Sequence, residues 1–150
     1  MASVSTRLLL FSRQFEKFYE QQFTSLLERS GLSMREIHVL LFLANNPGYD
    51  TARDVTEYRG IAKSQVSQAV DLMAERGLLR RTADREDRRV IRLAITEAGA
   101  PLAREAQAIQ AACGRRLLKD LSPEDAAHFR RLLETVLDSG AHLAEEEFFQ

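Results

Sequence analysis

Apolar side chains recur every three or four residues along the first thirty positions of the chain. This spacing predicts one amphipathic helix over residues 5–29. Glycine readily adopts the left-handed conformation that closes a helix, so Ser30-Gly31 is expected to end it. The residues on the apolar stripe are Leu8, Phe11, Phe15, Phe18, Tyr19, Gln22, Phe23, Leu26 and Leu27.

Three further helices are predicted in the next part of the chain. Ser33 and Glu36 have the spacing of a capping box, and the apolar helix that they open ends at the sequence Asn-Asn-Pro-Gly of residues 45–48. Two short helices follow over residues 51–58 and 63–75, with Arg59-Gly60 between them. Two short helices joined by such a turn are the signature of a helix-turn-helix.

Beyond Gly77 the apolar period changes to two, which predicts strands over residues 79–82 and 90–95. Every residue of the 83–89 segment after its alanine is charged. None of these residues can form a core, so we expect the tip of this hairpin to be solvated. Such a hairpin after a helix-turn-helix is a wing.

Two helices are predicted after the wing. Residues 96–97 cap the first, which is expected to reach Lys119, although Pro101 disfavours regular helix near its start. The last begins at Ser122-Pro123, with a serine cap and a proline at the first helical position, and is expected to bend at Ser139-Gly140.

This order of elements predicts a mainly helical α+β fold, a winged helix-turn-helix with terminal helices that form a dimerisation domain. The expected parts are an N-terminal dimerisation helix (1–32), a DNA-binding domain (33–97) and C-terminal dimerisation helices (98–150). Apolar side chains at both ends lack a partner within a monomer, so a two-fold homodimer is expected. They are Leu8, Leu9, Leu10, Phe11, Leu117, Leu118, Leu121, Leu132, Leu133, Val136, Leu137, Leu143, Phe148 and Phe149.

The composition is that of a globular chain: 150 residues, 45% hydrophobic and 29% charged. No apolar run approaches the roughly 20 residues that a membrane helix needs, and the N-terminus lacks the pattern of a secretory signal. We therefore expect a cytoplasmic protein without membrane contact. The single cysteine, Cys113, excludes a disulfide within the chain and a zinc cluster built on cysteines.

The net charge of −1 argues at first against a nucleic-acid-binding protein. However, residues 59–92 carry nine basic and five acidic side chains, net +4, whereas residues 120–150 carry two and eight, net −6. A basic middle segment and an acidic tail indicate surfaces with different partners.

Several segments of this basic region resemble the multiple-antibiotic-resistance regulator (MarR) family of bacterial transcription factors. They are Ala-Lys-Ser-Gln-Val-Ser at 62–67, Ala-Glu-Arg-Gly-Leu-Leu-Arg-Arg at 74–81, Asp84, Asp87-Arg88-Arg89, the strand 90–95 and Thr-Glu-Ala-Gly at 96–99. The resemblance implies a homodimer that binds a pseudo-palindromic operator in double-stranded DNA. It also implies, in most members, a repressor that a small ligand, a metal or an oxidant releases.

The helix over 63–75 presents polar side chains opposite its apolar face of Val66, Ala69, Val70 and Met73. Small hydroxyls and amides there suit a major groove, where glutamine reads adenine and Ser64 holds phosphate. The alternative is a merely solvated polar face. The expected DNA-binding residues of this helix are Lys63, Ser64, Gln65, Ser67 and Gln68.

Arg85, Arg88 and Arg89 lie within five residues at the tip of the wing. They favour contacts with phosphates and the minor groove, against the alternative of a hairpin that is charged only for solubility. The resemblance implies that Arg89 enters the minor groove and that Asp87 holds its guanidinium. Arg80 and Arg81 are further candidates for phosphate contacts.

The resemblance also implies an effector, because some relatives bind small aromatic acids between the dimer helices and the DNA-binding lobe. The residues carried over to such an aromatic or phenolic ligand are Phe15, Phe18, Tyr19, Arg35, His38 and Phe42. Plain core packing is the alternative for all six. No histidine has a metal-ligand partner at suitable spacing on its own helix, so neither a metal nor a cofactor is expected.

Three classes of function compete. A DNA-binding transcriptional regulator explains the basic wing. The alternative is a winged-helix protein-interaction module, with the tail of Glu145-Glu146-Glu147 and Phe148-Phe149 docking a partner; beside residues 85–89 the same tail would be self-inhibitory. An enzyme has no support, because we recognise no nucleophile–base pair, phosphate loop or catalytic carboxylates. Relatives that sense oxidants carry their cysteine in the first helix, so Cys113 is not expected to be a sensor.

Overall fold

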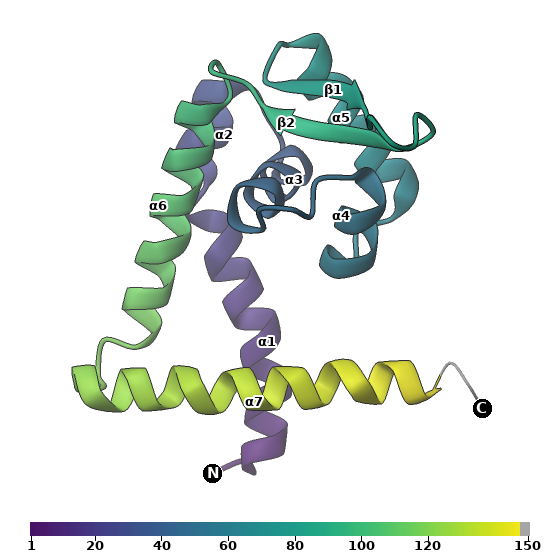
Figure 1. The fold of residues 1–150 in the computed structure, drawn as a ribbon. Coiled ribbons are helices and arrows are strands. Elements are labelled where there is room, and N and C mark those ends of the chain that lie inside the picture. Colours follow the sequence, from purple (N-terminus) through teal and green to yellow (C-terminus); the bar gives the residue numbers. More distant parts are fainter. Residues whose placement is uncertain (148–150) are drawn as a thin grey trace. The chain divides into compact units, whose positions relative to one another are not determined.

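A computed structural model describes the backbone of residues 1–147 and the side chains of residues 1–141. The chain forms two compact units, residues 1–111 and residues 112–150. The expected apolar contacts of Leu143, Phe148 and Phe149, and the role of the Glu145–Glu147 tail, fall outside the described side chains. The elements in Figure 1 are α1 (Val4–Gln21), α2 (Thr24–Ser30), α3 (Met34–Asn45), α4 (Ala52–Arg59), α5 (Lys63–Glu75), β1 (Leu79–Ala83), β2 (Ile91–Ile95), α6 (Ala100–Leu117) and α7 (Pro123–Glu147).

The predicted fold class is confirmed: the structure is mostly helical, with one two-stranded antiparallel sheet. Helix α3 lies at the centre of the first unit, where it packs against α4, α5 and β2. The core between these elements consists of apolar side chains that are almost fully buried. Among the largest are Phe23, Leu26, Ile37, Leu40, Val55, Val66 and Met73. None of the described helices is long and apolar enough to cross a bilayer.

The prediction of one helix over residues 5–29 is wrong, because the structure divides it into α1 and α2. The backbone N–H groups of Gln22 and Phe23 donate to carbonyls three residues back, at 3.1 and 3.0 Å, which tightens the chain into a turn. The hydroxyl of Thr24 donates to the Gln21 carbonyl at 2.9 Å. The turn places Phe23 and Leu26 in the core, while Gly31 closes α2 with a φ of 71°, as predicted.

Helices α3 and α4 begin differently, although each has a hydroxyl residue before it and a carboxylate three positions further on, and the capping box was predicted at α3. At α3 the box is absent, because the Ser33 hydroxyl donates to the buried Glu36 carboxylate instead of accepting a backbone N–H. At α4 the box is formed: Thr51 Oγ1 accepts the Asp54 N–H at 3.1 Å, and the Asp54 carboxylate accepts the Thr51 N–H at 3.0 Å.

Removing the cap of α4 is therefore expected to destabilise the first unit. Thr51→Ala leaves the Asp54 N–H without its acceptor and should lower the free energy of unfolding by about 1 kcal/mol. Thr51→Ser keeps the hydroxyl and is the matched control. Urea unfolding followed by circular dichroism measures both, and equal stability of the two variants would contradict the role of the cap.

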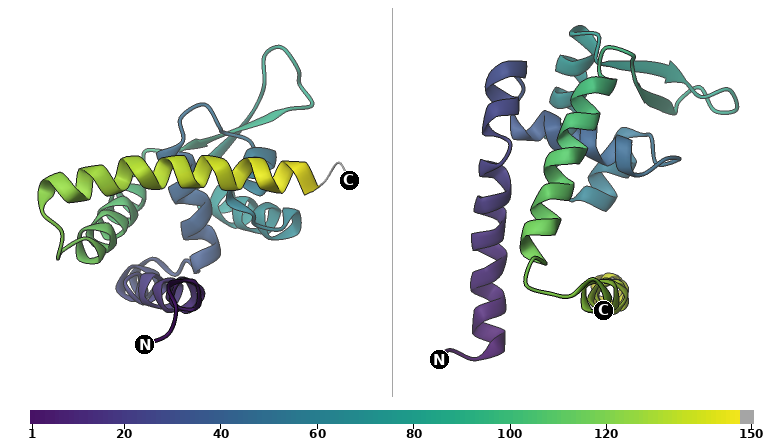
Figure 2. Two further views of the ribbon diagram at one scale, coloured as in Figure 1. Left: turned by 90° about the horizontal axis from the view of Figure 1, so that it is seen from below. Right: turned by 90° about the vertical axis from the view of Figure 1, so that its left-hand side faces the viewer.

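Strands β1 and β2 pair antiparallel from Leu79↔Ile95 to Ala83↔Ile91, so the predicted hairpin is confirmed, with β2 beginning one residue later than expected. Leu79 and Leu93 are the buried residues of the two strands. The hairpin projects beyond helices α3–α5 (Figure 2). We call residues 79–95 the wing.

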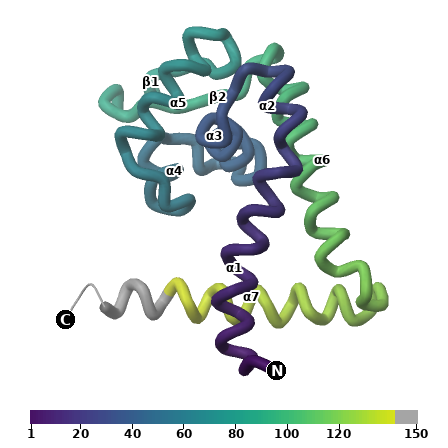
Figure 3. The backbone as a smooth tube through the Cα atoms, turned by 180° about the vertical axis from the view of Figure 1, so that it is seen from behind, coloured from purple at the N-terminus to yellow at the C-terminus, as the bar shows by residue number. Residues whose placement is uncertain are grey.

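Helix α6 begins at Ala100, beside Pro101, where the proline was expected to disturb the helix, and not directly after the predicted cap at residues 96–97. The Thr96 hydroxyl donates to the Gly77 carbonyl at 2.6 Å, and the Gly99 N–H bonds to Thr96, which holds the chain in a turn before the helix. Pro101 then lies in the first helical turn. A backbone N–H there has no acceptor within the helix, so the N–H that proline lacks costs no hydrogen bond. Seen from behind, α6 passes alongside α2 (Figure 3), where an ion pair joins Arg29 to Glu105.

The second unit contains the end of α6 and helix α7. Ser122 caps α7 as predicted, because its Oγ accepts the Asp125 N–H at 3.1 Å. The bend expected at Ser139-Gly140 is not found, since α7 continues as one helix from Pro123 to Glu147.

Candidate nucleic-acid interface

Helix α5 separates its apolar and polar faces as the sequence predicts. Val66, Ala69, Val70 and Met73 are buried against the core. The opposite face is exposed along its length, and it includes all the DNA-binding candidates of this helix. These are Lys63, Ser64, Gln65, Ser67 and Gln68.

Two side chains of the exposed face of α5 have partners on neighbouring elements. Arg35 Nη1 of α3 donates to Gln68 Oε1 at 2.8 Å. The guanidinium of Arg81 in β1 forms an ion pair with Asp71. The Arg81 guanidinium, a secondary candidate for a phosphate contact, is therefore shared with a carboxylate of α5.

The carboxylates of Asp84 and Asp87 at the wing tip accept hydrogen bonds from arginine side chains and from backbone N–H groups. Asp87 accepts from Arg89 Nε at 3.1 Å and Nη2 at 3.3 Å, and also from the Arg89 N–H at 3.1 Å. The hydrogen bond from the guanidinium, followed by that from the N–H, lowers the pKa of Asp87 below its ordinary value. Asp87 therefore stays ionised at neutral pH and orients a guanidinium that is itself 91% exposed.

A second carboxylate, Asp84, organises the turn at the tip. It accepts the N–H groups of Glu86 and Asp87 at 3.2 and 3.1 Å, and Arg92 Nε at 3.1 Å. The Asp87 N–H, and then the Arg92 guanidinium, lower the pKa of Asp84. Two of the three acidic groups at the tip are thus neutralised by neighbours, which lessens their repulsion of phosphates.

Arg92 anchors the wing to the body of the first unit, a role that our sequence analysis did not identify. Its Nη1 donates to Asp50 Oδ1 at 2.7 Å, in the loop before α4. The Leu93 N–H donates to the Asp50 carbonyl, also at 2.7 Å. Arg92 and Asp50 lie 42 residues apart in sequence, so local patterns carry no signal for the contact.

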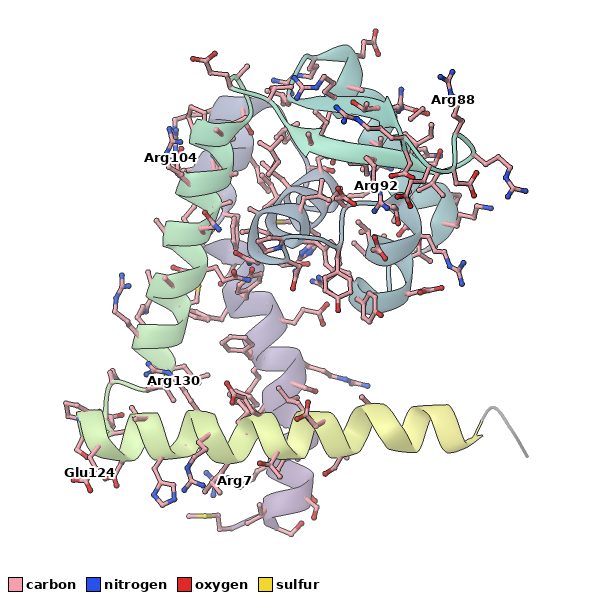
Figure 4. The ribbon with its side chains drawn as sticks, viewed as in Figure 1. Arg7, Arg88, Arg92, Arg104, Glu124 and Arg130 are labelled. Carbon is pink, nitrogen blue, oxygen red and sulfur yellow. The ribbon has the colours of Figure 1, made fainter. Side chains whose placement is uncertain are left out.

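Arg85 and Arg88 complete the basic tip. Both are exposed, and neither forms an ion pair with any residue that the structure describes. Figure 4 shows Arg88 extending away from the hairpin, whereas Arg92 lies against the body of the unit. The tip therefore offers three exposed guanidinium groups, of which Asp87 orients one.

A pocket of about 530 Å³ lies in the same unit, between α1, α3, α4 and α6. Four of the residues expected at an effector site line it: Phe15, Tyr19, His38 and Phe42. Phe18 and Arg35 are not among its lining residues. The lining also includes polar groups that our sequence analysis did not select, namely Glu16, Asn45, Asn46, Tyr58, Arg59 and Gln110.

His38 and Arg59 are hydrogen-bonded in this pocket, with 2.9 Å between Arg59 Nη2 and His38 Nδ1. Burial, and then the charge of Arg59, lower the pKa of His38 to about 4. The imidazole is therefore neutral at pH 7, and its Nδ1 accepts the hydrogen bond, because a guanidinium only donates.

The lowered pKa of His38 predicts a pH-dependent stability. The unfolded chain protonates this histidine near pH 6.5, so the unfolded state binds more protons and stability falls as the pH falls from about 6.5 to about 4. His38→Gln keeps an acceptor for Arg59 but does not titrate. Urea unfolding at pH values from about 7 to about 5 should show a smaller loss of stability for this variant. Equal losses in the two proteins would contradict the assignment.

Cys113 is buried in α6, and burial raises the pKa of its thiol. A raised pKa disfavours the thiolate, the form that reacts with oxidants. Among the described residues there is also no cluster of three histidine, cysteine, aspartate or glutamate side chains that could hold a metal ion.

Comparisons with known proteins agree with this geometry. The profile of the MarR family matches residues 30–90, which include α3, α4, α5 and β1. The chain is 30% identical, over 104 residues, to the HTH-type transcriptional regulator PetP of Rhodobacter capsulatus. The match covers 69% of this chain and 60% of PetP, so it spans less than two thirds of that relative.

Solved structures show the same fold over most of the chain. A MarR transcriptional regulator from Methanosarcina mazei matches with a TM-score of 0.77 at 19% identity, covering 93% of this chain and 99% of that one. CouR from Rhodococcus jostii, solved with p-coumaroyl-CoA bound, matches with a TM-score of 0.67 at 29% identity, covering 85% and 88% of the two chains.

Proposed function

Since this chain belongs to the MarR family, we propose that it is a transcriptional regulator that binds a pseudo-palindromic operator in double-stranded DNA as a homodimer. The observation that carries the proposal is the tip of the wing. It holds three exposed guanidinium groups, and a carboxylate with a lowered pKa orients that of Arg89. A hairpin that is charged only for solubility has no need of such an orientation.

Helix α5 and the wing have complementary tasks in this proposal. The exposed face of α5 enters the major groove, where Ser67 and Gln68 contact base edges and Lys63 and Ser64 contact phosphates. The wing lies along the neighbouring minor groove, which Arg89 enters, while Arg85 and Arg88 bind phosphates. Arg92 holds the wing in position by its contact with Asp50.

Exposed apolar faces support the homodimer. On α1, large apolar side chains are 41% to 80% exposed; they are Val4, Leu8, Leu9, Leu10 and Phe11. On α7 a second set is 39% to 64% exposed, namely Phe129, Leu132, Leu133, Val136 and Leu137. Exposed patches of this kind mark interfaces, and a second copy of the chain covers both in a closed two-fold assembly.

Light scattering after size-exclusion chromatography tests the dimer. The chain should have twice the monomer mass, and Leu132→Glu with Val136→Glu should restore the monomer mass, because carboxylates in an apolar interface are costly. Thr135→Glu, on the same helix but outside the apolar set, is the matched control. A monomeric wild-type chain would contradict this part of the proposal.

The pocket beside Arg59 supports regulation by an aromatic carboxylate. Its volume of about 530 Å³ is within the usual range for small-molecule sites, and aromatic walls with one arginine suit such a ligand. The relative CouR is known with p-coumaroyl-CoA, the thioester of an aromatic acid. We propose that a ligand of this class binds against Arg59 and weakens the affinity for DNA.

Calorimetric titration with hydroxybenzoates and hydroxycinnamates tests the pocket. Arg59→Met should abolish the binding of any hit, whereas Arg53→Met should not. Arg53 is a matched control, because it lies on the same helix but forms an ion pair with Glu57 outside the pocket. A hit that binds both variants equally would show that this pocket is not the site.

Fluorescence anisotropy with DNA from the region upstream of the chain's own gene tests the proposed function. We expect binding that is at least roughly 10³-fold tighter than to a scrambled duplex of the same length. Binding that is equally weak to both duplexes, even at low salt, would favour the alternative of a protein-interaction module.

A further inference from the structure

Arg35 connects the beginning of α3 to the exposed face of α5. Its Nη1 donates to Gln68 Oε1 at 2.8 Å, and its Nη2 donates to Glu36 Oε1 at 3.3 Å. The Glu36 residue is only 2% exposed and is also hydrogen-bonded to the Ser33 hydroxyl. A buried carboxylate thus fixes the guanidinium that contacts the exposed amide of Gln68.

We propose that Arg35 determines the base preference of α5 by holding the amide of Gln68 in one orientation. This inference rests on the proposed function, since it specifies how the same helix reads DNA. A guanidinium only donates hydrogen bonds, so it can face the amide oxygen but not the amide nitrogen. The oxygen of Gln68 is therefore turned toward the protein, and its Nε2 donates to no residue that the structure describes.

The held amide differs from a free one in the groups that it presents to DNA. A free glutamine places both its oxygen and its nitrogen at a base edge, which is the bidentate contact with adenine N6 and N7. In this structure the oxygen accepts from Arg35 and is thereby turned toward α3, which leaves the two hydrogens of Nε2 for the DNA. Guanine offers two neighbouring acceptors, N7 and O6, in the major groove. Gln68 is therefore expected to select guanine rather than adenine.

The position of Arg35 explains why it acts through Gln68 and not by direct contact. Its side chain is 34% exposed, and its Nη2 donates to the carboxylate of Glu36, which is almost fully buried. Arg35 is a positioning residue, and its removal should change the selected base rather than abolish binding. A merely structural role would lower the affinity for all sequences equally.

Selection from a duplex library with randomised half-sites tests this inference. The position that Gln68 reads is the one whose preference disappears in Gln68→Ala. There the wild-type chain should prefer guanine by about 5-fold to 150-fold, the range of one good bidentate contact. Arg35→Met should shift the preference to adenine or reduce it below about 3-fold, whereas Arg35→Lys, which also only donates, should keep guanine.

Two further variants separate specificity from stability. Arg29→Met removes another surface arginine with a carboxylate partner, Glu105, and should leave the selected sequence unchanged. If Arg35→Met does not fold, Arg35→Met with Glu36→Gln removes the buried charge together with its partner, and the same shift is expected.

The outcomes distinguish the inference from the proposed function. If the wild-type chain enriches no sequence, the proposed function fails, and the inference fails with it. If the wild-type chain enriches a site but Arg35→Met selects the same base as the wild type at the Gln68 position, only the inference is overturned.

Discussion

Replacing Gly99 with alanine is expected to destabilise the first unit by about 2–3 kcal/mol. A Cβ at this position would overlap the carbonyl oxygen of Leu78 and crowd Ile95 Cγ2, at 3.2 Å. The Leu78 carbonyl accepts the Thr96 N–H at 3.1 Å, so it has little freedom to move. This effect arises where the wing joins α6, and thermal unfolding should show a midpoint lowered by roughly 5–10 °C.

Gly114→Ala is the matched control for that substitution. Gly114 lies inside α6, and a Cβ there would have no neighbour within 4 Å among the atoms that the structure describes. Alanine inside a helix is favoured over glycine by roughly 0.5–1 kcal/mol, so this variant should be more stable than the wild type. If both substitutions changed stability by the same amount, the close approach of Gly99 to Leu78 would be wrong.

Removing the guanidinium of Arg89 is expected to weaken DNA binding for all sequences. Arg89→Ala should lower the affinity roughly tenfold and reduce the slope of log affinity against log salt by about 1, because one fewer counterion is released. Stability should hardly change, since exposed ion pairs such as Asp87–Arg89 contribute little to folding. Anisotropy titrations at several salt concentrations measure both quantities.

Arg29→Ala is the control for the loss of positive charge. It removes an exposed arginine that forms an ion pair with Glu105 of α6, away from the wing and α5. Its affinity for DNA should remain within about 2-fold of the wild type, because no phosphate contact is lost. An Arg89→Ala variant with unchanged affinity and unchanged salt slope would refute the minor-groove role of the wing.

Local patterns were sufficient to predict most of the helices and strands. The range of α5, Lys63–Glu75, and its buried face follow directly from apolar spacing. The incorrect predictions of helix starts occur where a side chain forms a hydrogen bond that the sequence pattern does not specify. The Ser33 hydroxyl donates to the buried Glu36 carboxylate instead of accepting a backbone N–H, and the Thr96 hydroxyl donates to the Gly77 carbonyl across the base of the wing.

The candidate site shows the same limit. The exposed arginines of the wing could be predicted from their clustering, and the Asp87–Arg89 ion pair is found between the two residues that the resemblance named. The contacts that position this machinery join distant segments: Arg92 with Asp50, and Arg35 with Gln68. These pairs form only when the fold brings α3, α5 and the wing together, so no short sequence motif predicts them.

The central claim is that α5 and the wing bind DNA in a two-fold arrangement. Hydroxyl-radical footprinting of the region upstream of the chain's own gene tests it most directly. We predict two protected half-sites whose centres lie one helical turn, about 10 base pairs, apart, or a multiple of that distance. Uniform cleavage along the duplex at low salt, with the protein in excess, would contradict the claim.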